Sequence, residues 1–209
     1  MIGLRHSLAV LTAVTGLIPG LHAQDSSFAV ATNLRVYQSL AASLSDSLAG
    51  LLTVADSPRV TVRVAPPDVA WFLQDAVERP FRGRNCVISA NDSARYGVEF
   101  GAVGMNVQYS NLRRNGIFGS RVLDRSVALI ARLRLVDRVL GTVVMTGERR
   151  AVFSDTIALS QVEEIEHAAV PATRGTIPTE DFFSGIVEPL VVVGAVAVAI
   201  FLLFTVRSR

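Results

Sequence analysis

The chain has 209 residues, 50% of them hydrophobic, and a formal net charge of +2 with 20 arginines, no lysine and one cysteine. The excess positive charge lies at Arg5, Arg207 and Arg209, whereas residues 24–185 carry equal numbers of arginines and carboxylates. A neutral folded part excludes the basic class of nucleic-acid-binding proteins, and a single cysteine excludes a disulfide framework within the chain.

The N-terminal segment Met1–Ala23 has the composition of a secretory signal. Arg5 lies in a short polar start, Ser7–Ile18 is apolar, and small residues precede a predicted cleavage between Ala23 and Gln24. An uncleaved N-terminal anchor is the alternative interpretation. No cysteine follows the predicted cleavage position, which excludes processing as a lipoprotein.

The next part of the chain predicts a helix and a strand. Asn33–Val54 carries an apolar stripe at three- and four-residue steps, which predicts an amphipathic helix capped by Thr32 or Asn33. Core packing is the favoured role of this stripe, with partner binding as the alternative. Arg59–Val64 alternates valines with polar residues and therefore predicts a half-buried strand.

A second helix and a short strand are predicted from the following residues. Asp68 is the expected cap of a helix over Val69–Val77, and Pro80 is expected to end it because proline cannot continue the backbone hydrogen bonds. Cys86–Ala90 is apolar and short, which predicts a buried strand with an inert, buried Cys86 thiol.

Three strands of an antiparallel meander are predicted in the second half of the domain. Tyr96–Tyr109 alternates loosely around its glycines, and a polar loop is expected over Asn111–Ser120. The clearest alternation follows, with Arg132 and Arg134 on the face opposite to an apolar set formed by Val127, Leu129, Ala131, Leu133 and Leu135. Leu140–Val152 is expected to return as its partner, so that one face of the sheet is solvent-exposed.

The end of the domain predicts one more helix and a spacer. Asp155 is expected to open an amphipathic helix over Ile157–Ala168, because apolar residues recur there at helical spacing. Val170–Thr179 contains glycine and two prolines and is expected to act as a spacer.

An apolar run near the end of the chain, free of charge from Leu190 to Val206, predicts a membrane anchor. Ile186–Val206 would extend over about 30 Å as a helix, which matches the hydrocarbon thickness of a bilayer. The anchor residues are Leu190 and Val206 at the two ends of the uncharged run, followed by Arg207 and Arg209. Alternatively, Val187-Glu188-Pro189 and the terminal arginines belong to a cleaved C-terminal sorting tag.

These segments predict five parts: a signal peptide (1–23), an extracytoplasmic domain (24–170), a linker (171–185), a transmembrane helix (186–206) and a cytoplasmic tail (207–209). The expected fold class is α+β, with an antiparallel or mixed sheet of four to five strands packed by two to three helices and the C-terminal transmembrane helix. The expected location is the bacterial cytoplasmic membrane, crossed once, with the domain on the periplasmic side.

No catalytic, metal-binding or cofactor-binding pattern stands out, so we assign no catalytic, metal or cofactor residues and expect no cofactor. Glu163, Glu164 and Glu166 form an acidic stretch, which is read as a solvated helix face. If the protein is an enzyme, Asp124, Asp137 or Glu99 near the meander would be its candidate carboxylates.

The order of elements resembles a known family. A leucine-rich helix, a valine strand, a second helix, a strand ending in Tyr109, and the hairpin over Arg132–Asp137 and Gly141–Val144 are followed by Asp155-Thr-Ile157. This order, over about Asn33 to Ala168, resembles the periplasmic α/β domain of the curli secretion lipoprotein (CsgG-like) family. The resemblance implies an assembly role in the cell envelope, without catalytic residues. A lipid-bearing cysteine and barrel hairpins are missing from the sequence, so no pore is implied.

The favoured function is therefore a non-enzymatic, membrane-anchored binding or assembly accessory protein of the bacterial cell envelope. Its expected partners are the membrane and an envelope protein or further copies of itself, with no nucleic acid and no small-molecule cofactor. The alternative is an envelope hydrolase or glycan-binding protein, which a cleft with paired carboxylates of raised pKa would favour.

Overall fold

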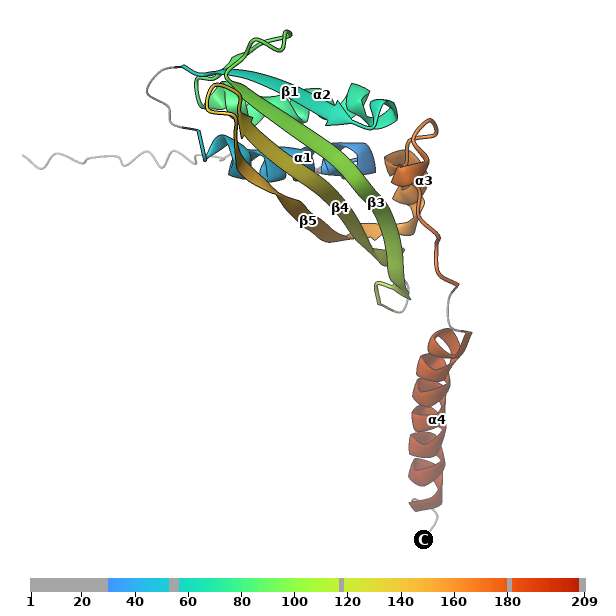
Figure 1. Cartoon of the computed structure of the whole chain (residues 1–209). Coiled ribbons are helices and arrows are strands. Elements are labelled where there is room, and N and C mark those ends of the chain that lie inside the picture. Colours follow the sequence, from blue (N-terminus) through green and yellow to red (C-terminus); the bar gives the residue numbers. More distant parts are fainter. Residues whose placement is uncertain (1–29, 53–56, 117–118, 180–181, 207–209) are drawn as a thin grey trace, which may run out of the picture.

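The computed structural model describes residues 30–52, 57–116, 119–179 and 182–206 (Figure 1). The predicted signal segment Met1–Ala23, its cleavage position between Ala23 and Gln24, and the tail residues Arg207 and Arg209 lie outside the described residues. The helices are α1 (Asn33–Ala49), α2 (Pro67–Gly83), α3 (Val162–Ile165) and α4 (Phe182–Val206), and the strands are β1 (Arg59–Ala65), β2 (Val87–Ile88), β3 (Tyr96–Arg114), β4 (Arg121–Asp137) and β5 (Thr142–Ala158).

A single mixed sheet with strand order β2-β1-β3-β4-β5 forms the centre of the fold. β1 runs parallel to both β2 and β3, whereas β3, β4 and β5 form an antiparallel meander. The parallel pairing of β1 with β3 is possible because the connection between them contains α2. In Figure 1, β3, β4 and β5 run side by side as three long, bent strands with α1 behind them.

One face of the sheet, called the covered face below, packs against α1 and α2. The predicted stripe of α1 is buried, with Tyr37, Ala41 and Leu48 fully inaccessible to solvent. β4 supplies the opposing layer, since its residues alternate between buried and more exposed positions along the strand. The buried set of β4 contains the five apolar residues expected from the sequence: Val127, Leu129, Ala131, Leu133 and Leu135. The other face, called the open face below, carries no helix among the described residues.

The second helix and the loop after β3 differ from their predictions. α2 continues past Pro80 to Gly83, and its first residues are preceded by Pro66 as a cap without a side-chain hydrogen bond, so Asp68 is not the cap. Phe81 is fully buried in the core. We attribute the extension to this burial, which offsets the hydrogen bond lost at the proline. The polar loop expected from Asn111 is also shorter, because β3 continues to Arg114.

The helix predicted from Asp155 is wrong in its first part. Asp155 pairs with Arg125 and Ile157 pairs with Leu123 in the antiparallel ladder, so β5 continues through Ala158. Only Val162–Ile165 forms an α-helix. The apolar residues from Ile157 onward recur at helical spacing. Residues 155–158 nevertheless form a strand, because pairing with β4 provides backbone hydrogen bonds and burial.

The transmembrane helix predicted for Ile186–Val206 is contradicted, and the fold class is corrected accordingly. A helix, α4, does form there, but no helix in the described part of the chain is both long and apolar enough to cross a membrane. The anchor role of Leu190 and Val206, and the single-pass topology derived from it, are therefore withdrawn.

Candidate functional site

The open face of the sheet brings charged residues from four strands into register. Arg63 of β1 pairs with Glu99 of β3, Glu99 pairs with Arg134 of β4, and Arg134 pairs with Thr146 of β5. The next row along the same face runs through Ala65, Gly101, Arg132 and Glu148. Because residues of one face alternate along each strand, these two rows are adjacent on the surface.

A hollow of about 320 Å³ lies over these rows. Small residues form its floor: Gly101 has no side chain, and Ala65 beside it has only a methyl group. We call this site the arginine hollow; its lining consists of Arg63, Ala65, Glu99, Phe100, Gly101, Arg132, Arg134 and Thr146. The concavity therefore arises where Ala65 and Gly101 leave space between Arg63 of β1 and the two arginines of β4.

The arginine hollow carries more positive than negative charge. Arg134 contacts Glu99 with an N–O distance of 3.3 Å, and both side chains are about half exposed. Arg63 forms an ion pair of 2.5 Å with Asp92. The Arg132 side chain is exposed and forms neither a hydrogen bond nor an ion pair with the described residues. Guanidinium groups recognise carboxylates and phosphates through paired N–H donors, so an anionic group is the ligand chemistry that the hollow fits.

A larger cavity of about 630 Å³ lies beside β1, next to α2 and the end of β2. Its charged residues already satisfy one another, since Arg82 pairs with Glu78 and Arg63 pairs with Asp92. The arginines at the end of α2 are similarly occupied: Arg79 and Arg82 both contact Asp75. The arginines of this cavity and of the end of α2 are therefore already paired with carboxylates.

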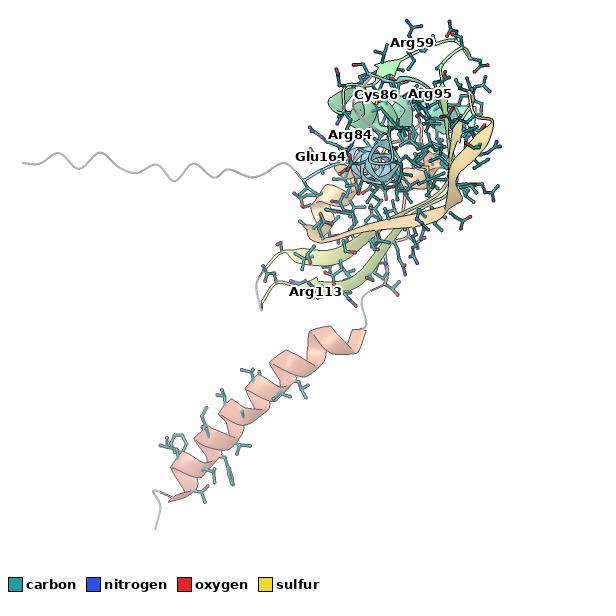
Figure 2. The ribbon with its side chains drawn as sticks, turned by 60° about the vertical axis from the view of Figure 1, so that its left-hand side comes forward. Arg59, Arg84, Cys86, Arg95, Arg113 and Glu164 are labelled. Carbon is teal, nitrogen blue, oxygen red and sulfur yellow. The ribbon has the colours of Figure 1, made fainter. Side chains whose placement is uncertain are left out.

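The candidate carboxylates of the enzyme hypothesis do not come together. Asp124 and Asp137 lie near opposite ends of β4, about 43 Å apart as measured along the strand at 3.3 Å per residue. Their arginine partners, Arg113 and Arg95, also lie toward opposite ends of the domain in Figure 2. Glu99 instead contacts Arg134 in the arginine hollow. No pair of these carboxylates forms an acid–base site.

The pKa values of Asp124 and Asp137 are lowered, not raised. Hydrogen bonds from Asn111, Thr156 and Arg113 lower the pKa of Asp124 to about 2. Burial raises the pKa of Asp137. Hydrogen bonds from Arg95 and from two backbone N–H groups together lower this pKa by more than burial raises it, so the net shift is downward. These two N–H groups, of residues 139 and 140, donate to Oδ1 of Asp137 and shape the turn between β4 and β5. Both carboxylates stay ionised and have structural roles.

We expect the carboxyl group of Asp124 to titrate near pH 2 in NMR spectra of the folded chain. Because its folded pKa is below the ordinary value of 3.8, the stabilisation is present above that value and is lost as the pH falls through about 2. Thr156→Val removes one donor and should raise the midpoint, whereas Thr146→Val on the same strand should leave it unchanged. A midpoint at 3.8 in the unmodified chain would contradict the hydrogen-bonded geometry.

The remaining titratable candidates have structural surroundings. Cys86 is buried, and burial raises the pKa of its thiol, which fits the expected inert cysteine; Figure 2 places it among the helices. Glu163 and Glu164 are exposed on α3, while Glu166 accepts a hydrogen bond from the backbone N–H of Gly175 at 2.9 Å. The described residues contain no group of three or more His, Cys, Asp or Glu side chains suited to a metal ion.

The most prominent polar residue of the covered face was not identified from the sequence. Arg125 is 1% exposed and forms two hydrogen bonds to Asp155, from Nε to Oδ1 at 2.8 Å and from Nη2 to Oδ2 at 2.5 Å. Its Nη1 also donates to the carbonyl of Ala31 at 2.7 Å and to Oδ1 of Asn33 at 2.9 Å. A signal was present, because Arg125 is in phase with Leu123 in the buried alternation of β4.

Asn33 extends this network from the start of α1 to the end of the domain. Thr32 is the helix cap, since its Oγ1 accepts a hydrogen bond from the N–H of Arg35 at 3.3 Å. The side-chain amide of Asn33 is therefore available to donate to the hydroxyl of Tyr109 at 3.0 Å and to the carbonyl of Thr173 at 2.7 Å. Burial raises the pKa of Tyr109 to about 12, so its hydroxyl stays neutral. The network therefore connects the start of α1 and the segment around Thr173 to strands β3 and β4 of the sheet.

Comparisons with known proteins add a weak structural likeness. No protein-family model matches the chain, and no curated protein matches it. Among solved structures, the chain is similar to a minor lipoprotein from Acinetobacter baumannii, with a TM-score of 0.30 and 8% sequence identity over 49% of this chain and 67% of that chain. A likeness at this TM-score carries no argument about function, so the resemblance to the CsgG-like family stays a prediction.

Proposed function

We propose that this protein is a non-enzymatic binding module of the bacterial cell envelope that holds an acidic segment of a partner protein on its open sheet face. The observation that carries the proposal is the arginine hollow, in which three arginines from two strands surround a floor of small residues. The predicted secretory signal over Met1–Ala23 supports the envelope location. The assembly role implied by the CsgG-like resemblance is part of this proposal.

The geometry of the hollow favours a flexible acidic segment over a compact ligand. Its residues come from β1, β3, β4 and β5, so the charges are spread across the sheet instead of converging on one point. Arg132 faces solvent, and although Glu148 is its neighbour on β5, no ion pair joins the two side chains among the described residues. A carboxylate that contacts Arg132 therefore gains a charge-assisted hydrogen bond without displacing an existing ion pair.

Binding of acidic peptides by the full chain tests this proposal. An Asp- and Glu-rich peptide should bind in fluorescence anisotropy measurements, and a peptide with Asn and Gln at the same positions should not. Arg132→Met should weaken binding about tenfold, because one charge-assisted contact is lost. The affinity should also fall as salt is added, since the arginines are exposed.

Arg59→Met is the matched control. Arg59 is exposed on β1, as Figure 2 shows, and does not line the hollow. Its replacement removes the same charge from the same sheet and should leave the affinity nearly unchanged. Equal losses in the two variants would indicate a general charge effect and would refute the site. If an acidic polysaccharide binds more tightly than the peptide, the glycan-binding alternative replaces the proposal.

A further inference from the structure

The two edges of the sheet are protected to very different degrees. On the β1 side, the short strand β2 covers the start of β1, and the N–H of Ser89 donates to the carbonyl of Val60 at 2.9 Å. Further along β1, the carbonyl of Val62 accepts a hydrogen bond from the Gln74 side chain of α2 at 3.3 Å. This edge is therefore closed by a strand, a loop and a helix.

The opposite edge is formed by β5 and is open along its length. β5 has 17 residues and is the last strand in the sheet order, so within the described residues it pairs with β4 alone. Val152 is 48% exposed and Phe153 is 37% exposed on this strand. A long edge strand with exposed apolar side chains presents a row of unpaired backbone groups and readily accepts another strand.

The middle of β5 carries the charges that decide which strand fits. Glu148, Arg149 and Arg150 are consecutive and exposed. Charges on an edge strand usually prevent pairing. Here, however, the two residues that share the open face have opposite signs, because Glu148 and Arg150 are two positions apart. A strand that runs antiparallel and presents the same sequence can match each of them with its opposite.

We propose that β5 pairs with β5 of a second copy of this chain, antiparallel and centred on Arg149, to form one continuous sheet through both copies. A two-fold axis normal to the sheet keeps the open faces of both copies on the same side, as required for a closed dimer. Glu148 then lies opposite Arg150 of the second copy, and this pair occurs twice. Within its own chain, Glu148 is the neighbour of Arg132 on β4, so it lies between two arginines.

The apolar residues match in the same register. Met145 lies opposite Phe153 of the second copy on the covered face, and Thr146 lies opposite Val152 on the open face. Contacts between a thioether and an aromatic ring, and between β-branched residues across strands, are both favourable. Each of these pairs also occurs twice because of the two-fold symmetry, so exposed apolar side chains are covered on both copies.

The charges favour the proposed register over the neighbouring symmetric registers. If the centre moves to Glu148, that carboxylate meets its own copy, and if it moves to Arg150, that arginine meets its own copy. Directly opposed like charges destabilise a strand pair. The proposed register also places Arg149 opposite its own copy, but it alone adds two Glu148–Arg150 pairs of opposite charge. All three side chains are exposed, so solvent and salt reduce the single repulsion.

Sedimentation velocity of the full chain tests the dimer and its register together. The unmodified chain should sediment as a dimer. Glu148→Arg places an arginine opposite Arg150 of the second copy in both of the symmetric pairs. This variant should raise the dissociation constant of the dimer at least about tenfold. The charge swap Glu148→Arg with Arg150→Glu restores opposite signs and should recover most of the affinity. Glu163→Arg makes the same charge change on the exposed surface of α3 and should have no effect.

Each contrary result overturns the inference. A chain that stays monomeric across the concentration range refutes the dimer. A dimer that is insensitive to Glu148→Arg is held elsewhere, for example through α4. Loss of the dimer in the single variant without recovery in the charge swap refutes the register. Because the readout is the oligomeric state and not peptide binding, the result is independent of the function proposed for the arginine hollow.

A cysteine crosslink provides a second measurement that does not depend on charge. In the proposed register Arg149 lies on the two-fold axis, so two cysteines introduced by Arg149→Cys would have Cβ atoms about 5 Å apart. This variant should form a disulfide-linked dimer on oxidation, whereas Arg132→Cys on β4 should not. The native Cys86 is buried and does not compete. Equal crosslinking of both variants would refute the register.

Discussion

Replacing Arg125 with methionine is expected to lower the free energy of unfolding by about 3 kcal/mol. The guanidinium is buried and makes hydrogen bonds to Asp155, Asn33 and the carbonyl of Ala31. Methionine keeps much of the apolar stem but none of the donors, so these acceptors lose their partner in a poorly hydrated site. The expected loss is at the lower end of the range for buried ion pairs, because the Asp155 side chain is 29% exposed and can gain water.

Denaturant unfolding of the full chain measures this effect. Arg132→Met is the matched control, since Arg132 is on the same strand but on the open face. It should change the free energy of unfolding by less than about 0.5 kcal/mol. The double variant Arg125→Met with Asp155→Asn should be more stable than the sum of its single losses predicts, because it leaves no unpaired buried charge. A loss below about 1 kcal/mol in Arg125→Met would contradict the network.

Leu133→Ala is expected to destabilise the domain by about 2–5 kcal/mol. Leu133 is 0% exposed and lies on the covered face of β4, which packs against the helices. Truncation removes buried apolar surface and leaves a cavity that the sheet cannot close, since β4 is held on both sides by β3 and β5. Chemical unfolding followed by circular dichroism measures the loss.

The neighbouring position provides the control for this variant. Arg134 follows one residue later on the opposite face and its ion pair with Glu99 is exposed. Arg134→Ala should therefore cost no more than about 0.5 kcal/mol. Because a slip of one residue would exchange the two faces, similar costs for Leu133→Ala and Arg134→Ala would refute the register of β4.

Several elements could be predicted from local patterns because the buried face repeats at a fixed period. The stripe of α1 and the alternation of β4 both persist over many residues, so they identify the secondary structure and its buried side. Where the local pattern was short or ambiguous, the prediction was wrong. Residues 155–158 have helical spacing but pair with β4, and Pro80 lies inside α2 instead of ending it.

The candidate site could not be predicted in the same way, because it depends on strand order. Arg63, Arg132 and Arg134 are far apart or unremarkable in the sequence, and only the register of β1, β3 and β4 brings them to one hollow. Whether the candidate carboxylates come together could not be predicted for the same reason. Asp124 and Asp137 are near each other in the sequence, but an extended strand places them at opposite ends of the sheet.

The sequence by itself determined the neutral charge of the domain, the amphipathic first helix and the antiparallel meander, since composition and periodicity are local properties. The tertiary structure alone decided that Arg125 is buried with Asp155 and that α2 is followed by a strand parallel to β1. It also decided that one sheet edge is closed while β5 remains open. These features depend on which distant segments exchange backbone hydrogen bonds, and that exchange is governed by burial and pairing over the whole chain.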